Sequence, residues 1–155
     1  MGLIAAIKEG NTLEVKQLIN SGANLCEVDE EGDSSFLLAI KYGMPLEIIE
    51  LFVAKGVDPL GLTPEGVGAI DIAIEVKRLE VVKYLHQMGL DLNEAKRDSM
   101  MTPLMIAACY NRVDIAKYLV LQDVDSEKKD RSGLRALDYA RKLGQKEVYQ
   151  FLQQL

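Results

Sequence analysis

Apolar residues recur along the chain at helical spacing, in segments about seven residues long. In one of them, Val81, Val82 and Leu85 fall on one side of a helix. Residues 113–119 and 147–152 repeat this arrangement. A shorter apolar segment precedes each such segment, and we expect first helices over 36–42, 70–76, 103–110 and 136–143. The pattern predicts pairs of short helices joined by tight turns, and therefore an all-α chain.

Three markers recur with a period of 33 or 34 residues. An alanine lies within each first helix: Ala6, Ala39, Ala73, Ala107 and Ala140. Four residues later stands a turn position: Gly10, Gly43, Lys77, Asn111 and Gly144. A second turn position follows: Gly22, Gly56, Gly89 and Asp123. Because the markers share one period, we expect five tandem units, at about 1–32, 33–66, 67–99, 100–133 and 134–155.

One segment carries a family motif. Residues 102–107 read Thr-Pro-Leu-Met-Ile-Ala, which resembles the Thr-Pro-Leu-His-x-Ala motif of ankyrin repeats. Residues 113–119 resemble the start of the family's second helix, and residues 22–25 resemble its glycine turn. The resemblance covers the whole chain. It implies an ankyrin-repeat solenoid of stacked helix–turn–helix units with loop or β-turn fingers. It favours one domain over 1–155, in a small free-standing protein of bacterial type.

The departures from the motif concern the helix starts. Only the fourth unit has Thr-Pro at the start of its first helix, although Ser34 can still cap the first helix of the second unit. Gly68 offers no side-chain cap, so we expect the weakest start in the third unit. Other residues replace the motif's histidine: Leu37, Asp71, Met105 and Asp138. The hydrogen bonds that this histidine makes in the family are therefore lost or replaced.

Composition narrows the class of function. The 155 residues contain 18 Lys and Arg against 24 Asp and Glu, a net charge of −6, which disfavours a nucleic-acid binder. No apolar run is long enough to span a membrane, and the start lacks the features of a secretory signal. With two distant cysteines, we expect reduced thiols and a cytoplasmic location.

Candidate catalytic groups are sparse. His86 is the one histidine, and neither a phosphate-binding loop nor a metal-ligand motif is present. We therefore expect no enzyme, no catalytic residue, no metal and no cofactor. An alternative function stays open, namely a haem- or metal-handling accessory protein that uses Tyr110, Cys109 or His86.

The resemblance also implies where a partner binds. In ankyrin repeats the loop tips and first helices line a concave surface that holds another protein. Carried over by position, the expected partner-binding residues are Glu30, Glu31, Asp33, Tyr42, Val76, Met101, Tyr110, Arg131 and Leu134. Tyrosine and methionine are typical of binding hot spots, although these side chains can also pack on the next unit. We expect a non-catalytic adaptor, inhibitor or accessory factor that is a monomer when free.

The predicted loops differ in charge. Residues 23–35 carry five carboxylates and no cation, whereas residues 124–136 carry four cations and three carboxylates. Two interpretations remain. The gradient orients a partner of opposite charge pattern, or the charges only solvate the turns.

Overall fold

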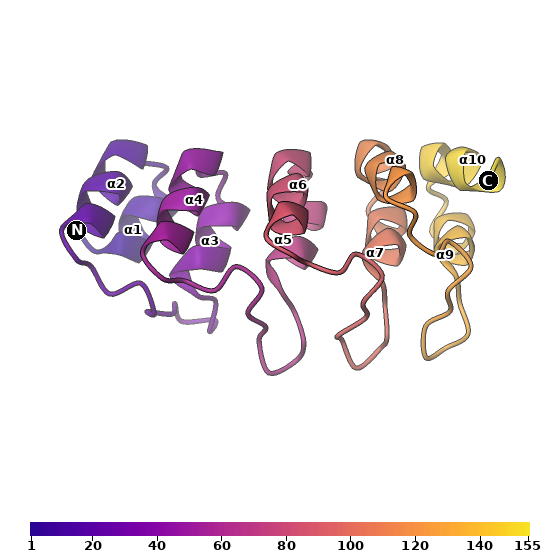
Figure 1. The fold of residues 1–155 in the computed structure, drawn as a ribbon, viewed down its shortest axis with the longest axis horizontal. Coiled ribbons are helices and arrows are strands. Elements are labelled where there is room, and N and C mark those ends of the chain that lie inside the picture. Colours follow the sequence, from indigo (N-terminus) through magenta and orange to yellow (C-terminus); the bar gives the residue numbers. More distant parts are fainter. The chain divides into compact units, whose positions relative to one another are not determined.

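Ten short α-helices and no β-strand make up the computed structural model, which describes residues 1–155 (Figure 1). The helices are α1 (Leu3–Lys8), α2 (Thr12–Asn20), α3 (Ser35–Lys41), α4 (Leu46–Ala54), α5 (Ala69–Glu75), α6 (Leu79–Gln87), α7 (Pro103–Cys109), α8 (Val113–Leu121), α9 (Ala136–Lys142) and α10 (Lys146–Gln153). The all-α prediction is confirmed. The predicted first helices 36–42, 70–76, 103–110 and 136–143 correspond to α3, α5, α7 and α9, with ends that differ by one residue at most.

The chain divides into two compact units, residues 1–61 and 62–155, hereafter unit 1 and unit 2. In unit 1, α1 packs against α3 and α2 packs against α4. In unit 2, α7 packs between α5 and α9, while α8 contacts both α6 and α10. Each unit therefore has an inner layer of odd-numbered helices and an outer layer of even-numbered helices (Figure 1).

Small residues allow the inner helices to pack closely. The five marker alanines are completely buried. Because the distance between packed helices depends on the side chains at the contact, an alanine at each repeat keeps neighbouring helices near one another. Larger apolar side chains fill the space between the layers, among them Phe52, Ile74 and Leu85. The apolar content of the chain thus lies at interfaces between neighbouring helices.

A left-handed residue ends each inner helix. Lys77 and Asn111 have φ angles of 62° and 56°, and glycines hold the same position in the other repeats. This conformation closes the turn before the outer helix, and its cost is low for glycine and moderate for asparagine. The predicted turn positions are confirmed.

Two inner helices begin with a side-chain cap from the expected residue. The hydroxyl of Ser34 accepts a hydrogen bond from the Leu37 N–H at 3.2 Å. The hydroxyl of Thr102 accepts one from the Met105 N–H at 3.3 Å. Both bonds satisfy an amide that has no partner within its own helix.

The other two inner helices that follow a loop use a carboxylate instead. Asp71 accepts a hydrogen bond from the Gly68 N–H at 2.7 Å, and Asp138 accepts one from the Arg135 N–H at 2.8 Å. Both aspartates stand where the motif has histidine. They replace its hydrogen bonds with a bond to the start of the helix. The expectation that the helix beginning after Gly68 has the weakest start stays a prediction. It was made without the hydrogen bond from the Gly68 N–H to Asp71.

Candidate protein-binding surface

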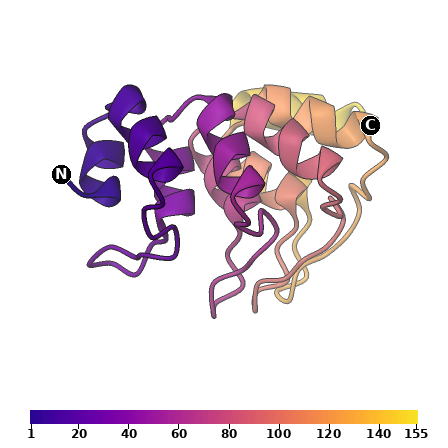
Figure 2. The same ribbon diagram turned by 60° about the vertical axis from the view of Figure 1, so that its left-hand side comes forward.

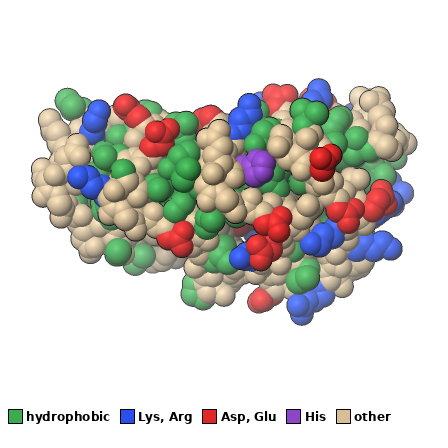
Figure 3. All heavy atoms as spheres, viewed as in Figure 1, with side chains coloured by type: hydrophobic (Ala, Val, Ile, Leu, Met, Phe, Trp, Pro, Cys, Tyr) green, Lys and Arg blue, Asp and Glu red, His purple; other side chains and the backbone are tan.

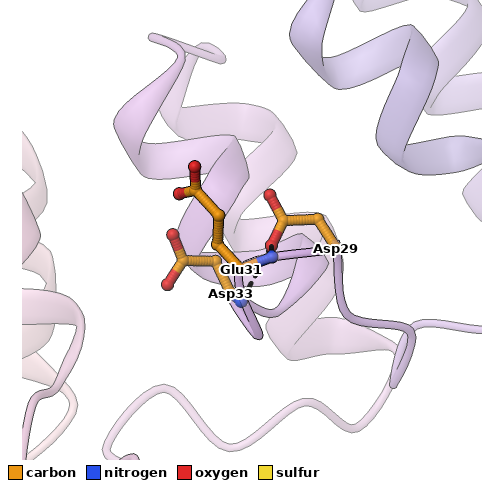
Figure 4. Close-up of side chains that lie close together, drawn as sticks. All are labelled: Asp29, Glu31 and Asp33. Atoms are coloured by element: carbon orange, nitrogen blue, oxygen red, sulfur yellow. Dashed lines mark hydrogen bonds between the residues drawn. The ribbon is translucent and has the colours of Figure 1, made fainter.

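The loop between α2 and α3 gathers three carboxylates, whose oxygens lie within 4.8 Å of one another (Figure 4). Asp29 accepts hydrogen bonds from the N–H groups of Glu31 and Asp33, each 3.0 Å long. Lys8 donates to the other Asp29 oxygen at 2.8 Å, and this hydrogen bond holds the pKa of Asp29 below its usual range. Lys41 lies 3.5 Å from Asp33. Two lysines therefore offset part of the negative charge.

The predicted residues of unit 1 occupy two exposed places. Glu30 and Glu31 lie at the tip of this acidic loop. Tyr42 follows the last residue of α3, and 44% of its surface is exposed. Lys41, its neighbour, connects the end of α3 to the loop through Asp33. Unit 1 thus presents an aromatic ring on an acidic surface.

In unit 2 three apolar residues take the position that corresponds to Tyr42. Val76, Tyr110 and Leu143 each follow the last residue of an inner helix, in α5, α7 and α9. Val76 is half-buried, whereas Tyr110 is 42% exposed and Leu143 is 52% exposed. Because the three helices pack side by side, these residues form one row, which we call the turn ladder. The expected partner-binding residues did not include Leu143, although it lies 33 residues after Tyr110.

An arginine connects two neighbouring members of the turn ladder, Val76 and Tyr110. The Arg112 guanidinium donates to the carbonyl oxygens of Ile74 at 3.1 Å and Glu75 at 2.6 Å. These are carbonyls at the end of α5, where a cation is favourable. The guanidinium also lies 5.8 Å from the centre of the Tyr110 ring. Arg112 therefore fixes Tyr110 relative to the turn beside it.

Two amide side chains connect the turn after α7 with the turn after α9 and the start of α10. Gln145 donates to the carbonyl oxygen of Cys109 at 2.6 Å, at the end of α7. Asn111 accepts from the N–H of Val148, in the first turn of α10, at 3.2 Å. The turns of unit 2 are therefore held in place before any partner binds, which lowers the entropy lost on association.

The loops of unit 2 extend from the same side of its helices, as Figures 1 and 2 show, and hydrogen bonds join them. The Arg131 N–H donates to the Ser99 carbonyl oxygen at 3.0 Å. The Asn93 side chain accepts from the Asp125 N–H at 2.7 Å. Lys, Arg, Asp and Glu side chains are exposed over these loops (Figure 3). Arg131, one of the predicted binding residues, is exposed here and forms no ion pair.

Two other predicted partner-binding residues are less exposed to solvent. Met101 and Leu134 are half-buried, each two residues before the first residue of an inner helix. The N–H of Leu134 donates to Asp130 at 2.9 Å. Asp130 is buried and also accepts a hydrogen bond from the Tyr139 hydroxyl. A role of Met101 and Leu134 in binding stays a prediction.

The residues considered for haem or metal handling lie in different layers of unit 2. Cys109 and Tyr110 are at the end of inner helix α7. Burial raises the pKa of the Cys109 thiol, which favours the protonated form over the metal-binding thiolate. His86 lies on outer helix α6, where its Nδ1 is 2.8 Å from the Tyr118 hydroxyl. The structure therefore does not bring the predicted ligands together.

The geometry defines a helical repeat protein, in which stacked helix pairs present their turns and loops to solvent. The comparison with known families agrees with this class. Residues 3–96 and 70–154 match the family described as ankyrin repeats (3 copies). The chain belongs to the ankyrin-repeat family, and the resemblance found in the sequence is confirmed.

Several curated proteins are similar to the chain. Alpha-latrotoxin-Lg1a of Latrodectus geometricus is 29% identical over 92% of this chain and 10% of its own length. The E3 ubiquitin-protein ligase Ufd4 of Drosophila melanogaster is 33% identical over 67% of this chain and 4% of its own length. The nuclear factor NF-kappa-B p105 subunit of Gallus gallus is 31% identical over 72% of this chain and 12% of its own length. The chain thus spans a small part of each relative.

Family membership gives a coarse function. Ankyrin repeats are generally protein–protein interaction modules without catalytic activity of their own. None of the ten helices is both long and apolar enough to cross a membrane.

Proposed function

We propose that the chain is a non-catalytic module that binds a partner protein through its loops and the ends of its inner helices. It acts as an adaptor, an inhibitor or an accessory factor. One observation carries the proposal: Tyr42 and Tyr110 are exposed at equivalent positions, where α3 and α7 end. Tyrosine is enriched among residues that dominate binding energy, because it offers a large surface and a hydroxyl.

The proposed contact residues differ between the units. In unit 1 they are Glu30, Glu31, Asp33 and Tyr42. In unit 2 they are Val76, Met101, Tyr110, Arg131 and Leu134, to which we add Leu143 because it is exposed at the same position as Tyr110. The inner-helix ends supply apolar contact area, and the loops supply charge.

The relatives support a binding role rather than a shared chemistry. Their names are those of a toxin, a ubiquitin ligase and a nuclear-factor subunit. Because each matches over 12% of its own length or less, the similarity extends to a small segment and not to the whole relative. We propose further that the free chain is a cytoplasmic monomer, is one continuous domain and binds no nucleic acid.

Affinity capture from the source cell tests the proposal. Tagged wild type and the double variant Tyr42→Ala with Tyr110→Ala are compared, and mass spectrometry identifies what co-purifies. We expect at least one protein to be lost from the double variant while its circular dichroism stays unchanged, because both side chains are exposed. Leu121→Ala is the matched control, since Leu121 is 77% exposed on outer helix α8. Equal capture by the double variant contradicts the proposal.

A further inference from the structure

Cations surround the turn ladder of unit 2. Within two residues of its three members, the sequence has five cations and one carboxylate, Glu75. The cations are Lys77, Arg78, Arg112, Arg141 and Lys142. The equivalent stretches of unit 1, residues 7–11 and 40–44, have two lysines and one carboxylate, Glu9, and both lysines pair with aspartates of the acidic loop. The excess of positive charge is therefore a property of the unit 2 turns.

Two of these cations are free to meet a ligand. Lys77 and Lys142 are exposed and form no ion pair in the structure. Arg141 is exposed, and its contact with Asp138 is 3.5 Å long. Asp138 is itself engaged by Arg135, which lies 3.2 Å away and donates its N–H as well. Apart from Asp138, which Arg135 engages, the carboxylate beside the turn ladder is Glu75, so the border keeps a net positive charge.

The spacing of the turn ladder suits an extended segment. Packed helices lie about 9 Å apart, so successive rungs on α5, α7 and α9 are separated by about that distance. A polyproline II segment advances about 9 Å in three residues and returns to the same face. Apolar side chains at positions i, i+3 and i+6 of such a segment match the three rungs.

We propose that the turn ladder binds an extended acidic segment of the partner protein, with apolar or aromatic side chains at every third residue. The apolar side chains pack on Val76, Tyr110 and Leu143, and carboxylates between them meet Lys77, Arg141 and Lys142. The hydrogen bonds of Arg112 and Gln145 hold the rungs in place, so little ordering is needed on binding. Opposite charge steers the segment and fixes its register. This inference rests on the proposed function, because it names the chemistry of the partner.

Peptide display tests this chemistry. A phage library of random 12-residue peptides is panned against the full chain, against Tyr110→Ser with Leu143→Ser, and against Arg141→Glu with Lys142→Glu. We expect wild type to enrich acidic peptides with apolar residues at three-residue spacing, and both double variants to lose them. Leu121→Ser on α8 is the control and retains the enrichment. For one selected peptide, fluorescence anisotropy is expected to show at least about tenfold weaker binding to the charge-reversed variant.

Three results overturn the inference. The first is that wild type enriches no peptides. The second is that the peptides lost from the double variants are neutral or basic. The third is that both double variants retain the acidic peptides. Circular dichroism of each variant confirms that the fold is intact. If the cellular partner is lost from the Tyr42 and Tyr110 variant while the selected peptides are not acidic, the proposed function stands and this inference fails. If acidic peptides bind but cellular capture is unaffected, the proposed function fails.

Discussion

The two units share one repeat but carry different charge. Unit 1 has four lysines, no arginine and ten carboxylates, whereas unit 2 has fourteen cations and fourteen carboxylates. The net charge of −6 therefore belongs entirely to unit 1. An average over the chain hides this contrast. The same scaffold presents a strongly acidic surface in one unit and a balanced surface with a basic border in the other.

The units also differ in how their exposed parts are held. In unit 1, lysines on the inner helices hold the acidic loop by ion pairs with Asp29 and Asp33. In unit 2, Arg112 and Gln145 connect neighbouring turns by hydrogen bonds, whereas the equivalent residues of unit 1 are Asn11, which caps α2, and the buried Met44. Exposed ion pairs weaken with salt, and close backbone contacts do not. We infer that unit 1 provides electrostatic attraction and unit 2 provides a fixed shape.

The largest expected effect comes from a glycine in the unit 2 loops. A Cβ at Gly66 would lie 2.3 Å from the Lys96 carbonyl oxygen, and its φ angle is +82°. At Gly32, in the unit 1 loop, φ is +88° but no atom lies within 4 Å of a Cβ. We expect Gly66→Ala to lower the free energy of unfolding by about 3 kcal/mol and Gly32→Ala by about 1 kcal/mol, since only the first adds a backbone clash. Urea unfolding measures the free energy of unfolding of both variants. Equal losses would show that the unit 2 loop is no more closely packed at this glycine than the unit 1 loop.

The next effect concerns the tied turns. Arg112→Ala removes two hydrogen bonds to the end of α5, and we expect a loss of about 2 kcal/mol in the free energy of unfolding. Arg112→Met places in unit 2 the residue type that unit 1 has at this position. Urea unfolding of both variants shows whether the hydrogen bonds of Arg112 or the apolar part of its side chain stabilises the turn. If Arg112→Met is as stable as wild type, the hydrogen bonds are not what holds the turn.

The two units are also expected to differ in how their aspartates make the free energy of unfolding depend on pH. Burial favours the neutral form of Asp130, but hydrogen bonds from the Tyr139 hydroxyl and from backbone N–H groups outweigh it and hold its pKa below the usual range. A lowered pKa stabilises the fold above the usual aspartate pKa, and this contribution is lost as the pH falls through the lowered value. We expect Asp130→Asn to lose less stability than wild type between about pH 6 and about pH 3.

Urea midpoints at the two pH values check this difference. Asp29→Asn is the matched variant in unit 1, because the pKa of Asp29 is lowered by the hydrogen bond from Lys8. Since the lysine of that pair is 38% exposed, solvent screens it, and we expect a smaller change in acid sensitivity for Asp29→Asn than for Asp130→Asn. An acid sensitivity of Asp130→Asn equal to that of wild type would show that Asp130 does not supply the effect.

The smallest effect lies in the outer layer of unit 2. Lys83 lies 5.5 Å from the centre of the Tyr118 ring, and Lys117 lies 6.0 Å from that of Phe151. Each lysine thus contacts the ring of the next repeat. We expect Lys83→Ala to cost about 0.5 kcal/mol, the value typical of an exposed cation–π contact. Lys16→Ala, at the same helix position in unit 1, is expected to cost nothing in a thermal melt. A loss equal to that of Lys83→Ala speaks against the contact.

The repeat, the helix pairs and the turn positions could be predicted from the sequence, because they depend on local periodicity. Lys77 and Asn111 were expected at turn positions on the 33- and 34-residue intervals alone, and their positive φ angles agree with turns there. Tyr42 and Tyr110 were expected at exposed helix ends, and they are exposed. Leu143 obeys the same interval, so its omission was avoidable.

Other features depend on contacts between repeats. Arg112 binds carbonyl oxygens 37 and 38 residues earlier in the chain, a distance that no local pattern reports. The contact of Gly66 with Lys96 has the same character. By contrast, Asp71 and Asp138 stand three residues after a helix start, where a carboxylate commonly bonds back to the first N–H. Their capping role was therefore visible in the sequence, although we expected only that the histidine's hydrogen bonds are lost or replaced, without naming the new partner.

Site-specific photo-crosslinking tests the central claim most directly. The photoreactive residue p-benzoylphenylalanine replaces Tyr110 or Leu121 in turn, and the tagged chain is irradiated in the source cell. The claim predicts a covalent adduct with a specific protein from position 110, on the turn ladder, and none from position 121, on the exposed outer face. An adduct from position 121 with none from position 110 would contradict it.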